Sequence, residues 1–411
     1  MKILVVDDDD FTTRVLQIQL RAMGLRECGY SGIELCSRGE EAAARLAEAP
    51  DGFGLVFCDL RMPGMDGVEF VRHLAGMGYR GGLVLISGAE PRVLQAVEQL
   101  ARAQGLEVLG RLSKPVAPAA LRELLRARDV APAEGGGDAA AEEAPAAATA
   151  SDARALEAAI LAGELFNVYQ PRIDLRSGAI IGVEALARWQ HRSRGIVSAA
   201  DFVPVAEDAG LASALARVVT ANALHDARHW IAAGRELDVA VNVSMASLAK
   251  LDLPDRVEAL ARAAGFPLER LVLELSTRRL PAGADARLDI MSRLRLKGVR
   301  LSIGGFGCTL SSLAELRDLP FSELRLDPEC VRGVAGDPSR RAIVHAALAL
   351  SREVDALVVA EGVAEREDLD CLRELGCPLG QGALFAEPMP ASEVAAWIRG
   401  WPGPGDVLAA A

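Results

Sequence analysis

The sequence has few aromatic residues and no long apolar run. Phe, Trp and Tyr make up 4% of the 411 residues, so Ala, Leu and Val must supply most of any core. No stretch approaches the roughly 20 apolar residues of a membrane-spanning helix. The apolar run at the N-terminus is too short for a signal peptide, because four acidic residues follow it from Asp7. These absences predict a cytoplasmic protein without a membrane segment.

Basic residues are fewer than acidic residues, and the cysteines form no closely spaced motif. Lys and Arg total 45 against 57 Asp and Glu, which gives a net charge of −12. This balance argues against nonspecific binding to nucleic acid or to anionic membranes, because both need a basic surface. The seven cysteines are scattered and contain no C-x-x-C motif. We therefore expect free thiols in a reducing compartment, with neither a disulfide framework nor a zinc site.

The pattern of apolar residues predicts an α/β protein with two folded domains. In residues 1–128, five short apolar runs alternate with helical patterns, which is typical of a doubly wound parallel sheet. Residues 129–152 are rich in Ala, Glu, Gly and Pro and read as a flexible acidic linker. Residues 153–402 contain about eight further strand patterns, the size of a (β/α)₈ barrel. Residues 403–411 are expected to form a C-terminal tail.

Polar residues follow four of the five strands expected in the first domain. Asp7 and Asp8 follow the first strand, Asp59 the third, Ser87 the fourth and Lys114 the fifth. In a doubly wound sheet these strand ends meet at one crevice. Three carboxylates there would attract a hard cation such as Mg²⁺, which neutralises charge when a phosphoryl group arrives on one Asp. The pattern therefore indicates aspartyl-phosphate chemistry.

These residues, with the motif D-x-R-M-P-x-M-D-G at 59–67, resemble the receiver domain of two-component response regulators. The resemblance implies a cognate histidine kinase as partner and a bound Mg²⁺. It implies the following roles in turn: phosphoacceptor Asp59, metal ligands Asp7, Asp8 and Asp59, switch hydroxyl Ser87 and phosphoryl-binding Lys114. One position departs from the pattern, because Arg111 stands where receivers carry a switch aromatic. A readout through an aromatic rotamer is therefore not expected.

The second domain resembles the EAL family of cyclic di-GMP phosphodiesterases. The motifs that carry the resemblance occur in the family's order: Tyr169-Gln-Pro171, Gly182-Val-Glu-Ala-Leu-Ala-Arg-Trp189, Asn242-Val-Ser244, Leu273-Glu-Leu275, Ala360-Glu-Gly-Val363 and Gly380-Gln-Gly382. The family hydrolyses cyclic di-GMP to pGpG with two Mg²⁺ or Mn²⁺ ions. By resemblance, metal-type positions are Glu184, Asn242, Glu274 and Glu361. Ligand-type positions are Gln170, Arg188, Asp327 and Gln381, and the Arg188 guanidinium suits a phosphate.

The family's catalytic positions are altered at five places. Gly304 and Gly305 stand where the family has an Asp-Asp metal pair, and Arg325 replaces the Lys of its K-I-D motif. Thr277 and Ala364 each replace a Glu. Removing one group that stabilises a transition state costs about 10²–10³ in rate. We therefore expect negligible hydrolysis and no normal metal pair, with the remaining glutamates crowded together or bound to Arg325.

The sequence predicts a phosphorylation-controlled response regulator with a degenerate EAL domain. Three functions of that domain stay open: a signalling module that binds a downstream protein, a receptor that binds cyclic di-GMP without cutting it, and a residual phosphodiesterase. The retained family motifs fit barrel packing as well as ligand binding, so they do not by themselves separate these functions. The resemblance to both families also leaves a homodimer open.

Overall fold

The computed structural model describes residues 1–23, 29–127, 150–276, 284–307, 316 and 319–401. They form two compact units, one drawn mainly from the residues up to 144 and the other mainly from those after 145. Most of the predicted linker (129–149) and the predicted tail (403–411) lie outside the described residues. Within the described residues, we find no helix with the length and apolarity to cross a membrane.

The first unit is a five-stranded parallel sheet with strand order β2-β1-β3-β4-β5. This confirms the doubly wound sheet predicted from the sequence. Its elements are β1 (Lys2–Val6), α1 (Asp10–Ala22), β2 (Ile33–Cys36), α2 (Gly39–Glu48), β3 (Phe53–Asp59), α3 (Gly67–Gly76), β4 (Gly82–Ser87), α4 (Pro91–Ala103), β5 (Glu107–Ser113) and α5 (Pro118–Ala127).

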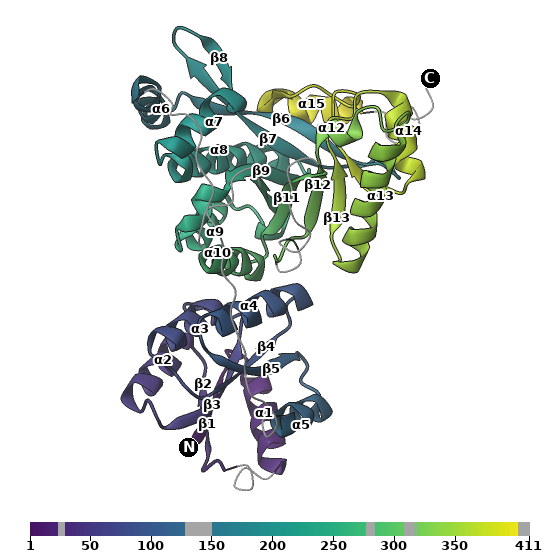
Figure 1. The fold of residues 1–411 in the computed structure, drawn as a ribbon. Helices are drawn as coiled ribbons and strands as arrows, with labels where there is room; N and C mark the ends of the chain where they lie inside the picture. The colour runs from purple at the N-terminus through teal and green to yellow at the C-terminus, as the bar shows by residue number, and fades with distance from the viewer. Residues whose placement is uncertain (24–28, 128–149, 277–283, 308–315, 317–318, 402–411) are drawn as a thin grey trace. The chain divides into compact units, whose positions relative to one another are not determined.

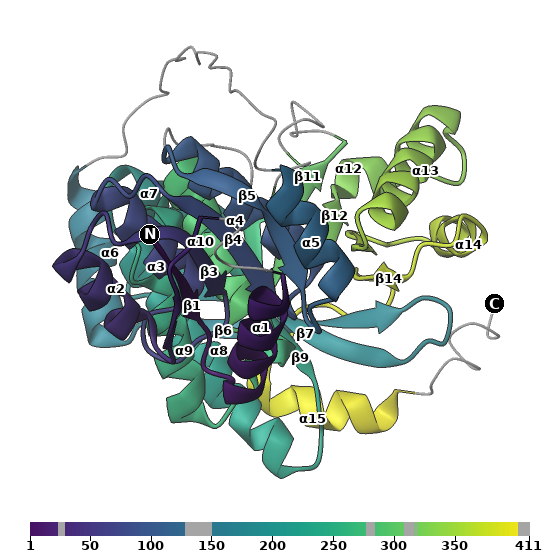
Figure 2. The ribbon, with the colours of Figure 1, turned by 90° about the horizontal axis from the view of Figure 1, so that it is seen from below.

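Helices cover both faces of this sheet. Alternate strand side chains enter opposite cores: Ile3 and Val5 pack with α1 and α5, whereas Leu4 and Val6 pack with α2, α3 and α4. In both views α1 and α5 lie side by side, away from α2 and α3 (Figures 1 and 2). Burial on both faces explains why the strands read as continuous apolar runs.

The chain from residue 150 onwards builds the barrel. Its elements are α6 (Ala150–Ala162), β6 (Leu165–Asp174), β7 (Ile180–His191), β8 (Gly195–Ser198), α7 (Ala199–Asp208), α8 (Ala212–Ala232), β9 (Asp238–Ser244), η1 (Met245–Ala249), α9 (Leu253–Ala264), η2 (Leu268–Arg270), β10 (Leu271–Ser276), α10 (Ala284–Leu296), β11 (Arg300–Phe306), β12 (Glu323–Leu326), α12 (Pro328–Val331), α13 (Pro338–Glu353), β13 (Leu357–Ala360), α14 (Arg366–Glu374), β14 (Leu379–Gly380), β15 (Met389–Pro390) and α15 (Ala391–Gly400).

The strand order β6-β14-β13-β12-β11-β10-β9-β7 closes on itself, because β6 also pairs with β7. These eight strands confirm the barrel predicted from the sequence, with one correction. Strand β6 runs antiparallel to both β7 and β14, so it is not part of a βα repeat. Gln170, a predicted ligand-type position, lies in the middle of β6, where the antiparallel register places it opposite Glu184.

Two glycines of the EAL-type motifs are explained by barrel packing. A Cβ at Gly182 would press against the carbonyl oxygen of Asp238 on β9, and one at Gly382 would press against the backbone of Val363. Because the crowding atoms are backbone, no rotamer change could relieve either clash. These two motif positions therefore fit the protein's own backbone, whatever the barrel binds.

Candidate functional site

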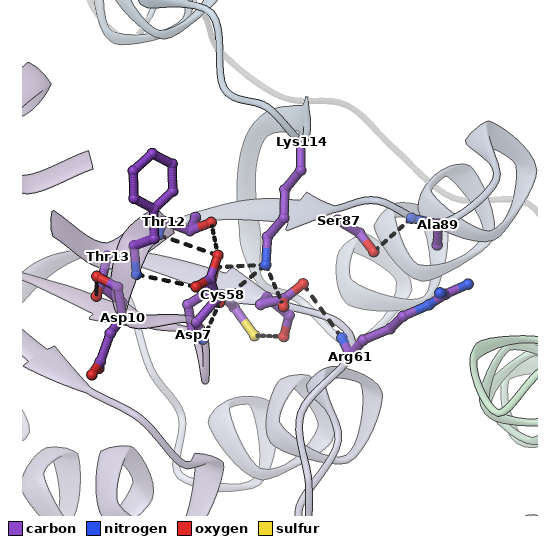
Figure 3. A network of polar contacts seen from close by, with 12 residues as sticks. Asp7, Asp10, Thr12, Thr13, Cys58, Arg61, Ser87, Ala89 and Lys114 are labelled. Carbon is purple, nitrogen blue, oxygen red and sulfur yellow. Dashed lines mark hydrogen bonds and ion pairs between the residues drawn. The ribbon is translucent and has the colours of Figure 1, made fainter. Parts of the chain in front are cut away.

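Lys114 joins two buried carboxylates at the carboxyl edge of the first sheet. Its Nζ lies 2.6 Å from Oδ2 of Asp59 and 2.8 Å from Oδ2 of Asp7. The Asp7 and Asp59 residues are 0% and 2% exposed. Figure 3 shows Lys114 reaching towards Asp7 from the end of β5. The structure thus brings together residues that are more than a hundred positions apart in the sequence, as the strand-end argument predicted.

Local backbone contacts hold the rest of this site. Asp7 accepts a hydrogen bond from the Asp9 amide at 3.0 Å, and Asp9 caps α1 by accepting from the amides of Phe11 and Thr12. The Ser87 hydroxyl accepts a hydrogen bond from the Ala89 amide at 3.0 Å, which fixes it at the end of β4 (Figure 3). Capping of this kind orients the loops, because it satisfies amides that the helix leaves unpaired.

The motif that follows Asp59 has a structural reason of its own. Asp66 caps α3 by accepting a hydrogen bond from the Glu69 amide at 2.9 Å. A Cβ at Gly67 would collide with the backbone of Asp59 and Leu60, so only glycine allows α3 to start this close to the site. The Asp-Gly pair therefore fixes the distance between α3 and the loop that follows Asp59.

The electrostatics of the site balance burial against charge. Burial raises the pKa of Asp7 and of Asp59, although the ion pairs with Lys114 pull in the other direction. Burial would lower the pKa of Lys114, but hydrogen bonds to Asp59 and Asp7 raise it above its ordinary value. The lysine therefore stays charged and offsets part of the carboxylate repulsion.

The carboxylates of Asp7, Asp8 and Asp59 fit a divalent cation. Each offers an oxygen within 4.8 Å of the others, and Asp8 is exposed, so the group opens to solvent. Carboxylate oxygens are the ligands that Mg²⁺ prefers, and the ion keeps several waters for an incoming phosphate. These residues could therefore hold the predicted Mg²⁺, which would supply charge neutralisation next to Asp59.

Arg111, which stands where receiver domains carry a switch aromatic, forms an ion pair. Its Nη1 lies 3.6 Å from Oε2 of Glu98 on α4, and Glu98 also accepts from Arg102 at 2.9 Å. Arg111 is exposed. An exposed pair of this kind contributes little stability. It does give β5 and α4 a charged contact in place of an aromatic one.

Arg325 lies among three glutamates inside the barrel. Its Nη1 contacts Glu274 directly and lies 3.7 Å from Oε1 of Glu184, while its Nε contacts Glu361. The side chains of Glu184 and Glu274 are only 5% and 2% exposed. The contact between Arg325 and the glutamates was one of the arrangements expected from the sequence, and the structure confirms it.

An amide network completes the environment of Glu184. Asn242 on β9 donates to Oε1 of Glu184 at 2.5 Å, and Gln381 donates to its other oxygen. Gln381 also donates to Gln170 at 3.0 Å, and Gln170 in turn donates to the Ala386 carbonyl at 3.0 Å. Three other predicted site residues, Asn242, Gln381 and Gln170, are therefore brought together around the Glu184 carboxylate.

The pKa values of the three glutamates shift in different directions. Burial would raise the pKa of Glu184, but the Arg325 charge and the surrounding hydrogen bonds lower it below its ordinary value. Burial raises the pKa of Glu274 well above its ordinary value, and the charge of Glu184 adds to this shift. Burial also raises the pKa of Glu361, against the Arg325 charge. Glu184 is thus the carboxylate that Arg325 keeps ionised.

This arrangement does not fit a pair of catalytic metal ions. Gly304 and Gly305 offer no side chain, and Arg325 occupies the carboxylates that a metal would need. Within the described part of the chain, only the group at Asp7 brings three acidic side chains close enough to share an ion. The cation among the barrel glutamates is therefore a guanidinium.

Comparison with known proteins identifies the families of the two domains. The EAL domain family matches residues 153–388, and the response regulator receiver domain matches residues 3–126. The chain belongs to the EAL-domain family, with a receiver domain before its EAL domain. The cyclic di-GMP phosphodiesterase RocR of Pseudomonas aeruginosa is 31% identical over 395 residues, which cover 95% of this chain and 96% of RocR.

Two further comparisons concern the EAL domain alone. MucR of Pseudomonas aeruginosa, a bifunctional diguanylate cyclase/cyclic di-GMP phosphodiesterase, is 38% identical over 232 residues, covering 56% of this chain and 34% of MucR. A solved structure of the PaMucR phosphodiesterase in complex with c-di-GMP has a TM-score of 0.56 and 35% identity, covering 59% of this chain and 99% of that one. The chain therefore spans about a third of full-length MucR.

The structure also describes three other predicted residues of the EAL domain. Arg188 is half-buried and donates to the Ala187 carbonyl at 2.9 Å. Asp327 caps α12 by accepting from the Glu329 amide at 3.0 Å. Ala364 is exposed, and Thr277 lies outside the described residues. Asp327 thus has a capping role that the sequence reading missed.

The sequence reading also missed a buried ion pair in the EAL domain. Arg172 on β6 lies 2.5 Å from Glu323 on β12, and both residues are 0% exposed. The charge of Arg172 lowers the pKa of Glu274 and of Glu361, although burial outweighs it in both. A signal was present, because side chains two apart on a strand share one face. Arg172 is two residues after Gln170, and Glu323 is two before Arg325.

Proposed function

We propose that the protein is a response regulator whose phosphorylation at Asp59 controls an EAL domain that does not hydrolyse cyclic di-GMP. In this proposal the EAL domain acts as a signalling module that binds a downstream protein. The kinase partner follows from the receiver domain. The identity with RocR and MucR, both named phosphodiesterases, would by itself favour hydrolysis. The proposal therefore depends on individual residues.

The observation that carries the proposal is the position of Arg325. Its guanidinium contacts Glu274 and Glu361 and lies near Glu184, so it offsets part of the negative charge of the cluster without a divalent ion. Arginine keeps its proton at all physiological pH values, which makes it a fixed cation and a poor proton carrier. Gly304 and Gly305 replace two acidic metal ligands, so the groups that would hold a metal to activate water are missing. Arg325 replaces the lysine, so lysine-type chemistry also lacks its usual group.

The receiver residues support phosphorylation at Asp59. The carboxylate is held at 2.6 Å from Lys114, which would bind a phosphoryl oxygen once Asp59 is modified. Ser87 ends the neighbouring strand and presents a hydroxyl whose position is fixed by the Ala89 amide. Mg²⁺ bound by Asp7 and Asp8 would offset the repulsion between an incoming phosphate and these carboxylates.

A second candidate is a receptor that binds cyclic di-GMP without cutting it. It is favoured by Arg188, which is half-buried and has no carboxylate partner among the residues that the structure describes. A guanidinium in that state can still bind a phosphate through two parallel hydrogen bonds. Asn242, which is exposed at the cluster, could contact the same ligand.

The test is calorimetric titration of cyclic di-GMP into the full chain, with and without Mg²⁺ or Mn²⁺, followed by analysis of the same mixture for pGpG. No heat and no product would support the signalling module. Micromolar binding without product would establish the receptor instead. Release of pGpG would overturn both. The variant Arg188→Gln should abolish any binding, whereas the exposed control Arg192→Gln should leave it unchanged.

A further inference from the structure

The loop between β3 and α3 (residues 60–66) lies directly beside Asp59. The Arg61 amide donates a hydrogen bond to Oδ1 of Asp59 at 3.4 Å (Figure 3). The Gly67 amide donates to the Leu60 carbonyl at 3.1 Å, which closes the loop at its base. A shift of this β3–α3 loop would therefore move a group that contacts the Asp59 carboxylate.

A carboxylate from another helix holds the β3–α3 loop between its two ends. Oε1 of Glu40, in the first turn of α2, accepts a hydrogen bond from the Met65 amide at 3.0 Å. The other carboxylate oxygen, Oε2, lies 3.5 Å from Nε of Arg38. Hydrogen bonds from its own amide and from the Met65 amide lower the pKa of Glu40, although burial opposes them. Glu40 is therefore ionised at neutral pH and accepts as a carboxylate.

Two glycines show how closely the start of α2 and the β3–α3 loop fit each other. A Cβ at Gly39 would lie 2.8 Å from the carbonyl oxygen of Met65, and no rotamer change could relieve a clash with backbone. A Cβ at Gly64 would collide with Oε1 of Glu40. Gly64 also has φ of +79°, a left-handed conformation that glycine adopts without strain. The contact between Glu40 and the loop is therefore built into both segments of the chain.

We propose that Glu40 is a positioning residue for phosphoryl transfer to Asp59. In that reaction an oxygen of Asp59 attacks the phosphorus of the donor, and the bond from phosphorus to the leaving group breaks, with the electron pair leaving on that group. Glu40 acts through the β3–α3 loop, because its own contact is with Met65 whereas Arg61 contacts Asp59. The inference rests on the function proposed above, since it concerns phosphorylation of Asp59.

The test compares the rate of phosphorylation in the unmodified full chain, Glu40→Ala and Glu40→Gln. Acetyl phosphate with Mg²⁺ is the donor and releases acetate, and intact-protein mass spectrometry follows labelling with time. Glu40→Ala should slow labelling by about fivefold, the effect of one typical hydrogen bond. Glu40→Gln keeps an oxygen that can accept from the Met65 amide, so it should restore most of the rate.

Hydrogen exchange gives a readout that does not depend on phosphorylation. The amide of Met65 is protected by its bond to Glu40, so in Glu40→Ala it should exchange with deuterium at least about fivefold faster. Glu40→Gln should exchange at nearly the rate of the unmodified protein. Equal exchange in Glu40→Ala and the unmodified protein would overturn the inference, because Glu40 would then not hold the loop.

The matched control is Glu41→Ala, which removes the next carboxylate of α2. Glu41 lies 3.2 Å from Nη2 of Arg45 on the same helix. Loss of either carboxylate reduces repulsion of the anionic donor, so an effect of charge alone would speed labelling in all three variants. Slower labelling in Glu40→Ala alone would support the positioning role, and equal rates in Glu40→Ala and Glu41→Ala would overturn it. No labelling of the unmodified protein would overturn the function proposed above, and this inference with it.

Discussion

Nη1 of Arg325 lies 3.7 Å from Oε1 of Glu184, and the same guanidinium contacts Glu274 and Glu361. One fixed positive charge therefore lies close to three carboxylates. Burial raises the pKa of Glu274 and Glu361, so protonation can remove the negative charge that Arg325 does not balance. The cluster is consequently compatible with burial in the absence of a divalent ion, which is the basis of the proposed loss of hydrolysis.

Removing the Arg325 charge should destabilise the EAL domain strongly. Arg325→Met leaves Glu184 ionised and buried without its cation, and breaking a buried pair in this way costs about 3–5 kcal/mol. Urea unfolding followed by tryptophan fluorescence isolates the effect, because all four tryptophans lie after residue 150. The exposed pair of Arg192 with Glu164 offers a control, and Arg192→Met should leave the unfolding midpoint unchanged. Equal midpoints for both variants would contradict the structural role of Arg325.

Manganese should distinguish Arg325→Met from the unmodified protein. Without the guanidinium, no cation offsets the negative charge of Glu184, Glu274 and Glu361. Carboxylates bind Mn²⁺ well. Added Mn²⁺ should therefore raise the melting temperature of the EAL domain in Arg325→Met more than in the unmodified protein, because ligands that bind only the folded state stabilise it. Both proteins also carry the Asp7 site, so the variant Asp7→Asn is made in each as the control. An identical response would show that Arg325 does not exclude a metal.

The two glycines should tolerate aspartate to different degrees. Among the described residues, a Cβ at Gly304 meets only the Leu275 carbonyl at 3.7 Å, which is an ordinary contact. Gly305 has φ of +83°, a left-handed conformation that strains other residues. Gly305→Asp should therefore cost about 1 kcal/mol more in the free energy of unfolding than Gly304→Asp. The tryptophan fluorescence assay measures both, and the reverse order would contradict the backbone argument.

Phosphorylation should require Asp59. Incubation with acetyl phosphate and Mg²⁺ should add one phosphoryl group to the unmodified protein and none to Asp59→Asn, because the amide is a poor nucleophile. Intact-protein mass spectrometry at neutral pH measures the phosphoryl group in each protein. The control is Asp51→Asn, which changes an exposed carboxylate in the loop before β3 and should be labelled like the unmodified protein. Labelling of Asp59→Asn at the level of the control would place the phosphoacceptor elsewhere.

Most of the receiver site could be predicted from the sequence, because strand ends in a parallel sheet meet at one edge wherever the chain goes between them. Asp7, Asp59 and Lys114 illustrate this. The direction of β6 could not be predicted, since an apolar strand pattern carries no sign of its orientation. The capping role of Asp327 could not be predicted either, because a carboxylate after a strand can bind a ligand or cap the next helix.

The Arg172–Glu323 pair shows a different limit. The period of two places both residues on the inner face of the barrel, but it does not say which strands lie opposite one another. That information depends on closure through β6 and β7. Likewise, the sequence could predict that Arg325 binds a glutamate. It could not predict that Arg325 contacts Glu274 and Glu361 at once, because that depends on how β10, β12 and β13 are arranged in the folded barrel.

The raised pKa of Glu274 should appear as a pH dependence of stability. The folded state holds this proton more tightly than the unfolded state, whose carboxyl has the ordinary value of 4.5. The contribution of Glu274 is therefore fully present below pH 4.5 and is lost as the pH rises through its raised folded pKa. Glu274→Gln keeps the shape of the protonated form and removes the titration. Relative to the unmodified protein, the variant should gain stability as the pH rises from 4.5, by about 1.4 kcal/mol per unit of pKa shift.

The measurement is urea unfolding by tryptophan fluorescence at several pH values, with Glu393→Gln as the control because Glu393 is exposed on α15. Glu184→Gln provides the opposite sign. The pKa of Glu184 is lowered in the folded state, so its contribution is present above the ordinary value of 4.5 and is lost as the pH falls through the folded pKa. Glu184→Gln should therefore lose stability relative to the unmodified protein above that value and recover it in acid. Parallel curves for all three variants would mean that Arg325 does not set the protonation of the glutamates differently, and the metal-free account of the cluster would fail.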